Sequence, residues 1–188
     1  MTLEESAREL ERGDSAPGFE LPGTDGASHA LVDYHDHDAL LVVFTCNHCP
    51  YAQAKIEALN GLAESYEEVA VVGINANDAE EYPDDSFERM QELVEDGTVR
   101  YDAYLRDESQ EVARAYGAVC TPDPFLFAKR DGGFELAYHG RLDDATGPDE
   151  EPSGEHGFEM AGAIESVLTG VPVDQQFQPS RGCSIKWK

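Results

Sequence analysis

The alternation of apolar and polar segments along the chain predicts a sheet whose strands are separated by helices. Apolar runs predict strands at about 16–21, 40–45, 69–74, 125–127 and 134–139. The runs at 40–45 and 69–74 contain no charged residue, which is typical of strands buried on both faces. Because Asp131-Gly132-Gly133 is a turn sequence, the last two strands are expected to form a hairpin.

Helical segments fill the intervals between these strands. They are expected at about 3–12, 47–66, 85–96, 108–116 and 157–169. In the second of them, Ile56, Leu59, Leu62 and Tyr66 share one helical face. Strands that alternate with helices before a final hairpin indicate an α/β fold with a mixed sheet. We expect one domain over 1–188, with a core at about 14–170, an acidic solvent-exposed loop at 143–156 and a tail at 171–188.

The charge of the chain restricts its partners. The sequence holds 39 Asp and Glu residues against 13 Lys and Arg, a formal net charge of −26. Because such a surface repels phosphate groups, we expect neither nucleic acid nor an anionic membrane among its partners. Self-repulsion of this size opposes folding unless salt screens it, so we interpret the composition as adaptation to the salty cytosol of a halophile. An ordinary acidic protein is the alternative.

The N-terminal sequence favours a cytoplasmic location. Residues 1–5 contain no basic region, and no apolar run approaches the roughly 20 residues that cross a bilayer. We therefore expect a soluble cytoplasmic protein. In that compartment, four cysteines are more typical of catalysis or metal binding than of a disulfide framework.

The candidate chemistry lies where the 40–45 run gives way to a helix, at Cys46-Asn47-His48-Cys49-Pro50. Two thiols at this spacing can form a disulfide couple. The first amides of the helix and its dipole favour a negative sulfur, so we predict Cys46 as the attacking thiolate and Cys49 as the resolving thiol. The alternative is that Cys46 and Cys49 are buried structural thiols with no redox role. A zinc site would need a second ligand pair, and Cys120 and Cys183 are not spaced as one.

The order of these features resembles a known fold. The chain resembles the thioredoxin fold in the order of its elements: a strand, the Cys-x-x-Cys, a helix, a strand, a helix and then Thr-Pro before a strand. The opening Ala16-Pro17-Gly18-Phe19-Glu20-Leu21 resembles the redoxin branch of that superfamily, the AhpC/TSA and TlpA/ResA-like proteins, over about 14–170. The resemblance implies a central mixed β-sheet flanked by helices. It also implies a thiol–disulfide oxidoreductase without a cofactor, which acts on a protein or small-molecule disulfide and is reduced by a thiol protein.

The same resemblance assigns roles to individual residues. It implies a cis peptide bond at Pro122, which exposes the backbone of Thr121 to an extended substrate chain. His48 matches the histidine between the cysteines of disulfide isomerases and DsbA-like oxidases. We therefore expect His48 to stabilise the Cys46 thiolate and make the couple more oxidising than that of thioredoxin. A solvated loop histidine is the alternative.

Other functions stay open at this point. In peroxiredoxins a threonine stands three residues before the peroxidatic cysteine. Here Cys46 takes the place of that threonine before Cys49, and residues 117–127 contain no arginine. A thiol peroxidase is one alternative, with Thr45 and Arg141 as candidate donors. A non-catalytic protein that binds a metal or a partner is another, although Sco-like copper proteins have three residues between their cysteines.

The remaining two cysteines each have two interpretations. Cys120 adjoins Thr121 and is either a packed apolar side chain or a third redox thiol. Cys183 lies in the basic and aromatic segment 181–187, which we expect to dock on the domain. A resolving role for Cys183 is the alternative.

Overall fold

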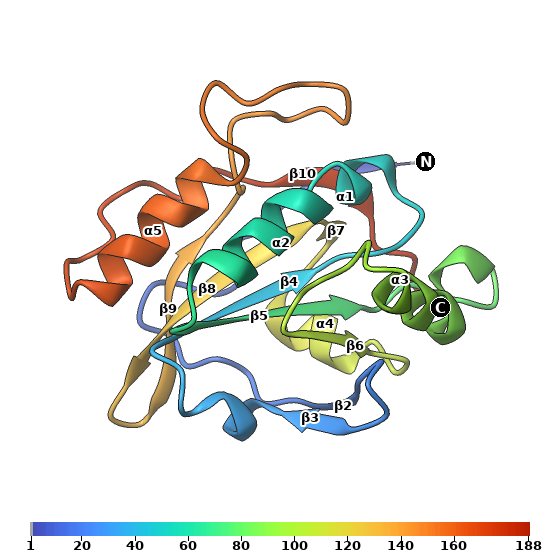
Figure 1. Cartoon of the computed structure of the whole chain (residues 1–188), viewed down its shortest axis with the longest axis horizontal. Helices are drawn as coiled ribbons and strands as arrows, with labels where there is room; N and C mark the ends of the chain where they lie inside the picture. Colours follow the sequence, from blue (N-terminus) through green and yellow to red (C-terminus); the bar gives the residue numbers. More distant parts are fainter. Residues whose placement is uncertain (1) are drawn as a thin grey trace.

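A computed structural model describes residues 2–188 (Figure 1). Its strands are β1 (Leu3–Glu5), β2 (Glu20–Pro22), β3 (Ser28–Ala30), β4 (Ala39–Phe44), β5 (Val69–Asn75), β6 (Ala103–Arg106), β7 (Cys120–Thr121), β8 (Asp123–Arg130), β9 (Gly133–His139) and β10 (Arg181–Ser184). Its helices are α1 (Pro50–Gln53), α2 (Ile56–Ser65), α3 (Phe87–Glu95), α4 (Glu111–Tyr116) and α5 (Phe158–Leu168), with 3-10 turns η1 (Leu31–Tyr34) and η2 (Pro83–Asp85).

A central sheet of five strands has the order β6-β5-β4-β8-β9. β4, β5 and β6 run parallel, whereas β8 pairs antiparallel with both β4 and β9. The predicted mixed sheet and its final hairpin are therefore confirmed. Among the described residues, no helix is long and apolar enough to cross a membrane.

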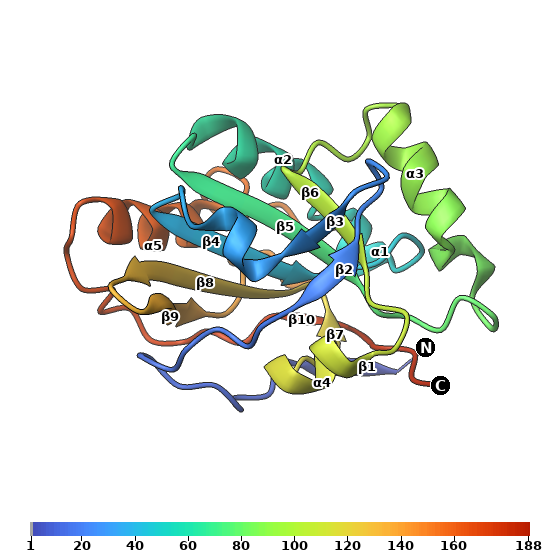
Figure 2. The ribbon, with the colours of Figure 1, turned by 90° about the horizontal axis from the view of Figure 1, so that it is seen from below.

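Alternate side chains of β4 enter two apolar layers. Leu40, Val42 and Phe44 lie in the layer that α4 and the β2–η1 segment complete. Leu41 and Val43 pack with α2 and α5. Figure 2 shows α4 on the opposite side of the sheet from α2 and α5. The segment after Phe44 thus emerges between two packed layers, at the carboxyl end of the parallel strands, where α/β proteins place their sites.

Several elements differ from the sequence-based expectations, and the short strands β3, β7 and β10 were not predicted. The helix expected at 3–12 is wrong, because residues 3–5 form β1 and pair with β10. The helix expected at 47–66 is divided into α1 and α2, with the break at Ala54 and Lys55. β6 was not expected. It is short and contains Arg106, which is nevertheless buried.

The acidic loop at 143–156 is only partly solvent-exposed. Asp143 is fully buried and accepts hydrogen bonds from Lys55 Nζ at 2.5 Å and from the Gly157 amide at 2.7 Å. These contacts join the start of α2 to the start of α5. The expectation of a solvated loop is therefore wrong at Asp143, because its partner Lys55 lies 88 residues away in the sequence.

The C-terminal tail contributes to a second, small sheet. The three strands of this sheet have the order β1-β10-β7, and β10, from the tail, is antiparallel to both neighbours. The expected docking of the tail is confirmed. β10 consequently lies against β7, the two residues that precede Pro122.

Candidate functional site: three cysteines beside a cis-proline

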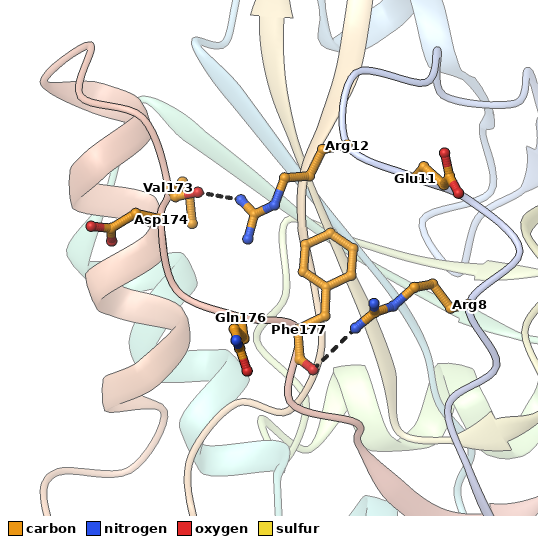
Figure 3. A pocket seen from close by; sticks show the side chains of 7 residues that line it. All are labelled: Arg8, Glu11, Arg12, Val173, Asp174, Gln176 and Phe177. Carbon is orange, nitrogen blue, oxygen red and sulfur yellow. Dashed lines mark hydrogen bonds between the residues drawn. The ribbon is translucent and has the colours of Figure 1, made fainter.

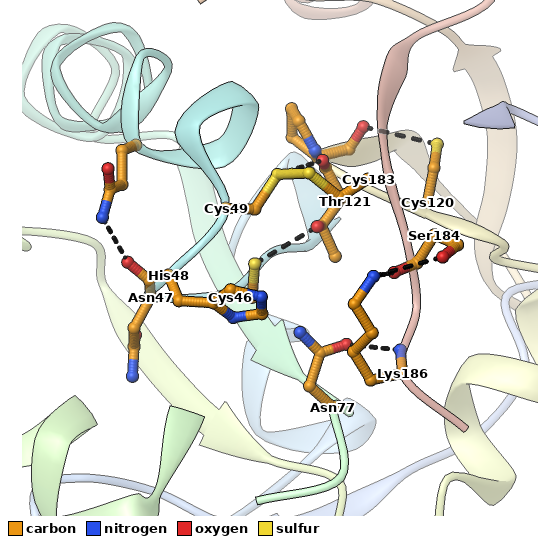
Figure 4. The surroundings of a disulfide bond; sticks show 12 residues. Cys46, Asn47, His48, Cys49, Asn77, Cys120, Thr121, Cys183, Ser184 and Lys186 are labelled. Atoms are coloured by element: carbon orange, nitrogen blue, oxygen red, sulfur yellow. Dashed lines mark hydrogen bonds between the residues drawn. A yellow bond between two sulfur atoms is a disulfide. The ribbon is translucent and has the colours of Figure 1, made fainter. Parts of the chain in front are cut away.

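The Cys-x-x-Cys segment and the Thr121–Pro122 loop meet at the carboxyl end of β4 (Figure 4). The Thr121–Pro122 peptide bond is cis, as predicted. Cys46 Sγ is hydrogen-bonded to Thr121 Oγ1 at 3.2 Å, and Cys49 Sγ lies 3.7 Å from Thr121 O. Cys49 is the N-cap of α1, with Pro50 in the first helical position. Both sulfurs of the motif therefore contact Thr121.

The disulfide of the structure joins Cys49 to Cys183, not to Cys46. The two Cα atoms are 6.3 Å apart, and the residues are 134 positions apart in the sequence. Pairing of β10 with β7 sets Cys183 opposite Thr121 and so beside Cys49. The expected Cys46–Cys49 pairing is thus replaced in this state by a bond from Cys49 to the tail. Cys46, Cys49 and Cys183 share one buried cluster with Ala52.

The environment of Cys46 differs from the one expected. The sequence predicts a stabilised thiolate, yet burial raises the pKa of Cys46 to about 12, and the charge of Asp85 adds to this. Hydrogen bonds from Thr121 and from the backbone of Cys49 and His48 act in the opposite direction and lower that pKa. The expected backbone donors are therefore present. Desolvation outweighs them because Cys46 is buried, with 2% of the residue exposed.

His48 is fixed by a carboxylate that the sequence did not reveal. Asp85 is fully buried at the end of η2, and His48 Nδ1 donates to Asp85 Oδ2 at 2.5 Å. The Nδ1–H tautomer follows because a carboxylate only accepts hydrogen bonds. The Asn47 amide donates to Asp85 Oδ1 at 2.6 Å, and Asn77 Nδ2 to Oδ2 at 2.7 Å. The imidazole also stacks on Tyr82, with ring centroids 5.3 Å apart. His48 is therefore an ordered residue rather than a solvated one.

Donor atoms of Cys46, His48 and Asp85 lie within 4.8 Å of one another. A thiolate, an imidazole and a carboxylate are chemically suited to a transition metal. Both oxygens of Asp85, however, already accept hydrogen bonds from nitrogen donors. The same three groups also form a nucleophile, a base and an orienting carboxylate. In this structure the hydrogen bond of Cys46 Sγ goes to Thr121 Oγ1, and His48 Nδ1 bonds Asp85.

Cys120 and Arg141, which were also considered from the sequence, have partners other than Cys46, Cys49 and Cys183. Cys120 is buried, with its Sγ directed at Pro122 O and Ser180 O at 3.8 and 4.0 Å. Burial raises its pKa, as expected for a packed apolar side chain. Arg141 forms a two-pronged ion pair with Glu159 of α5 at 2.7 and 2.8 Å. It is therefore committed elsewhere and does not serve as the donor considered for a peroxidase.

We expect His48→Gln to make the Cys46–Cys49 couple more reducing. The change keeps the backbone amide but removes the imidazole, so Asp85 opposes a thiolate on Cys46 more strongly. The shift should be tens of millivolts, because about 30 mV corresponds to 1.4 kcal/mol for a two-electron couple. Redox titration in a chain that also carries Cys120→Ser and Cys183→Ser measures it. His35→Gln, at an exposed position, is the control, and equal potentials would remove the tuning role of His48.

Comparison with known proteins shows the family and the fold of the chain. The family model described as AhpC/TSA matches residues 12–133, more than half of the chain. An uncharacterized conserved protein of Geobacillus kaustophilus is 39% identical, with a TM-score of 0.90 over 100% of this chain and 97% of that one. A hypothetical protein of Sinorhizobium meliloti 1021 is 38% identical, with a TM-score of 0.89 over 98% and 99%.

More distant structures share the fold alone. A provisionally assigned thiol:disulfide interchange protein DsbE of Chlorobium tepidum is 20% identical, with a TM-score of 0.63 over 85% of this chain and 99% of that one. The fold is therefore the thioredoxin fold that the sequence predicts. A search of curated proteins gives no match. Because the family model matches more than half of its residues, the chain belongs to the AhpC/TSA family.

Proposed function

We propose that this protein is a thiol–disulfide oxidoreductase that uses Cys46 and Cys49. One observation carries the proposal: the sulfurs of both residues lie at Thr121, next to the cis bond to Pro122. A strand edge beside a dithiol can align an extended chain by main-chain hydrogen bonds, so that its disulfide faces the attacking sulfur. Substrate binding by Thr121 and Pro122 is part of this proposal.

The reaction proceeds by two thiol–disulfide exchanges. Cys46 Sγ attacks one sulfur of the substrate disulfide, and the other substrate sulfur leaves with the electron pair and takes a proton. Cys49 Sγ then attacks Cys46 Sγ, which releases the second substrate thiol and leaves a Cys46–Cys49 disulfide. We assign to His48 the acceptance of the Cys46 proton; its hydrogen bond to Asp85 and the 4.8 Å limit on the separation of the three donor atoms support this assignment. A thiol protein supplies the two electrons that reduce the enzyme again.

The proposed setting is a salty cytoplasm. The net charge of −26 supports it, because such a chain repels itself less when ions screen the surface. The same charge supports protein or small-molecule disulfides as substrates, rather than partners rich in phosphate. The halophilic origin and the cytoplasmic location stay predictions.

A redox titration tests the proposed function. In a chain with Cys120→Ser and Cys183→Ser, only Cys46 and Cys49 stay as thiols. The chain is equilibrated in dithiothreitol buffers, its free thiols are alkylated, and the oxidised fraction is measured by mass spectrometry. The result should be a reversible two-electron couple. The same chain with Cys49→Ser added is the control and should show none. A non-catalytic binding protein would give no reversible couple in either chain.

A thiol peroxidase is the second candidate, and the Cys49–Cys183 disulfide favours it. A thiolate on Cys49 would attack hydrogen peroxide, giving a sulfenic acid and hydroxide, which takes up a proton from solvent to become water. The Cys183 thiol would then condense with that sulfenic acid, releasing a second water and forming the observed disulfide. This alternative requires donors for the peroxide oxygens.

We expect oxidation of the reduced protein by peroxide to be slow. Arg141 is paired with Glu159, and the guanidinium of Arg106 donates to Asn77 O at 2.7 Å. Neither arginine is thus available to stabilise the leaving oxygen. Stopped-flow measurement of peroxide oxidation checks this, with Cys49→Ser as the control. A rate constant of about 10⁴ M⁻¹s⁻¹ or more, within the enzymatic range, would rank the peroxidase first.

A further inference from the structure

The edge of β7 beside the cis-proline is already occupied, and its occupant is the C-terminal strand of the same chain. β10 pairs antiparallel with β7, with Cys183 opposite Thr121 and Ser184 opposite Cys120. This is the backbone edge to which the proposed function assigns an extended substrate. Cys183 also bears the sulfur that is bonded to Cys49. In both strand position and covalent bond, β10 stands where a substrate chain would stand (Figure 4).

The residue before Cys183 is matched to this close approach. A Cβ atom on Gly182 would lie 1.8 Å from Thr121 O and 2.5 Å from Thr121 C. Real Cβ atoms do not approach a carbonyl group so closely, so any side chain at this position would push the strand away from β7. Glycine is therefore required by contact with the cis-proline loop, and not by the conformation of the tail itself.

We propose that β10 is an intramolecular substrate strand and that Cys183 is a third reacting thiol. Cys46 and Cys183 alternate as the disulfide partner of Cys49. This proposal rests on the proposed function and deepens it. The external substrate is then an extended segment whose cysteine follows glycine. It must displace β10 from the edge of β7 before it reaches Cys46.

The exchange is an isomerisation without net oxidation. The Cys46 thiolate attacks Cys49 Sγ, the Cys49–Cys183 bond breaks, and the electron pair leaves with Cys183 Sγ. Cys183 takes up one proton and Cys46 has lost one, so protons also balance. The three cysteines share one buried cluster, and the sulfurs of Cys46 and Cys49 both lie at Thr121. With Cys46–Cys49 bonded, only non-covalent contacts hold β10, and the edge of β7 can open.

Anchors on both sides of β10 keep it close after the disulfide has exchanged. Before the strand, the ring of Phe177 lies between the guanidinium groups of Arg8 and Arg12, at 5.0 and 4.6 Å (Figure 3). After the strand, the Lys186 amide donates to Asn77 Oδ1 at 2.9 Å. A tethered strand of this kind has a high local concentration at β7, so it competes with any external chain.

Gly182→Ala separates this proposal from a purely structural disulfide. The probe is a synthetic peptide with the sequence of residues 180–186, supplied as a mixed disulfide with glutathione. Gly182→Ala should lower the KM for this peptide about tenfold, the effect of roughly 1.4 kcal/mol on an equilibrium. Gly18→Ala is the matched control, because an added Cβ there meets nothing within 4 Å. A peptide with valine in place of its glycine should have a higher KM with every chain.

Disulfide mapping supplies a readout that does not depend on peptide reduction or on correct folding of the glycine variant. In oxidised Cys120→Ser protein, acid quenching and mass spectrometry should find both Cys46–Cys49 and Cys49–Cys183. Cys183→Ser should leave only the first. If the Cys46–Cys49 couple is absent even in the Cys120→Ser, Cys183→Ser chain, the proposed function fails. The function stands and this inference is overturned in two cases. In the first, the Cys46–Cys49 couple forms but the Cys49–Cys183 disulfide does not exchange with it. In the second, the KM for the peptide is the same in Gly182→Ala as in the parent chain.

Discussion

Replacement of Cys49 by serine, in a chain that also carries Cys183→Ser, is expected to trap covalent complexes between Cys46 and substrate. Replacement of Cys46 by serine should instead abolish disulfide reduction. Attack by Cys46 gives a mixed disulfide, and its release needs a second thiol close to the same sulfur. Cys49 and Cys183 both belong to the cluster that contains Cys46. Both must be removed for the complex to persist.

The trapping experiment uses mass spectrometry of adducts formed with a disulfide substrate. Cys49→Ser alone should give fewer adducts than the double variant, because Cys183 loses its partner and can resolve the complex. Cys120→Ser is the control and should behave as the parent chain, since its sulfur faces Pro122 O and Ser180 O. Adducts that form only in the Cys46→Ser chain would reverse the two roles and place the attacking sulfur at Cys49.

A steep rise of thermal stability with salt is the second large effect that we expect. The formal charge of −26 is the difference between 39 acidic and 13 basic residues, so most carboxylates have no Lys or Arg of their own to pair with. Surface pairs such as Arg100 with Glu57 and Glu64 are exposed and contribute little. Repulsion between the remaining carboxylates therefore dominates. At 1 M salt the Debye length is about 3 Å, which removes most of that repulsion.

We expect the melting temperature to rise by roughly 10 °C or more between low and molar potassium chloride, since each kcal/mol shifts a domain of this size by about 2–4 °C. Calorimetry or circular dichroism measures the change. Sucrose is the control, because it favours compact states by exclusion without screening charge. A melting temperature that does not change with potassium chloride, or that sucrose raises equally, would contradict the halophilic interpretation.

Local sequence patterns were sufficient for most of the sheet and for the position of the Cys46–Cys49 motif after a buried strand. The unbroken apolar runs became β4 and β5, because a strand buried on both faces needs apolar side chains at every position. The cis bond at Pro122 was predicted because the residues around it match a known loop. The short β6 was missed, since four residues with a terminal arginine carry little periodic signal.

Asp85 shows why part of the site could not be predicted from the sequence. It is one of 39 acidic residues, and its neighbours in the sequence give no sign that it is buried. Its role follows from contacts with His48, Asn47 and Asn77, which come from other segments of the chain. A carboxylate is tolerated there only because donors surround it, and that compensation exists only after folding.

The sequence by itself determined the α/β fold, the Cys46–His48–Cys49 motif and its place after a buried strand, because these depend on local periodicity and spacing. Tertiary structure alone decided which cysteines meet. Cys183 lies 134 residues from Cys49, and no pattern links the two. They become neighbours because β10 pairs with β7 in a register that Gly182 permits. Partners of this kind depend on hydrogen bonds between distant backbones, which a one-dimensional pattern of side chains does not encode.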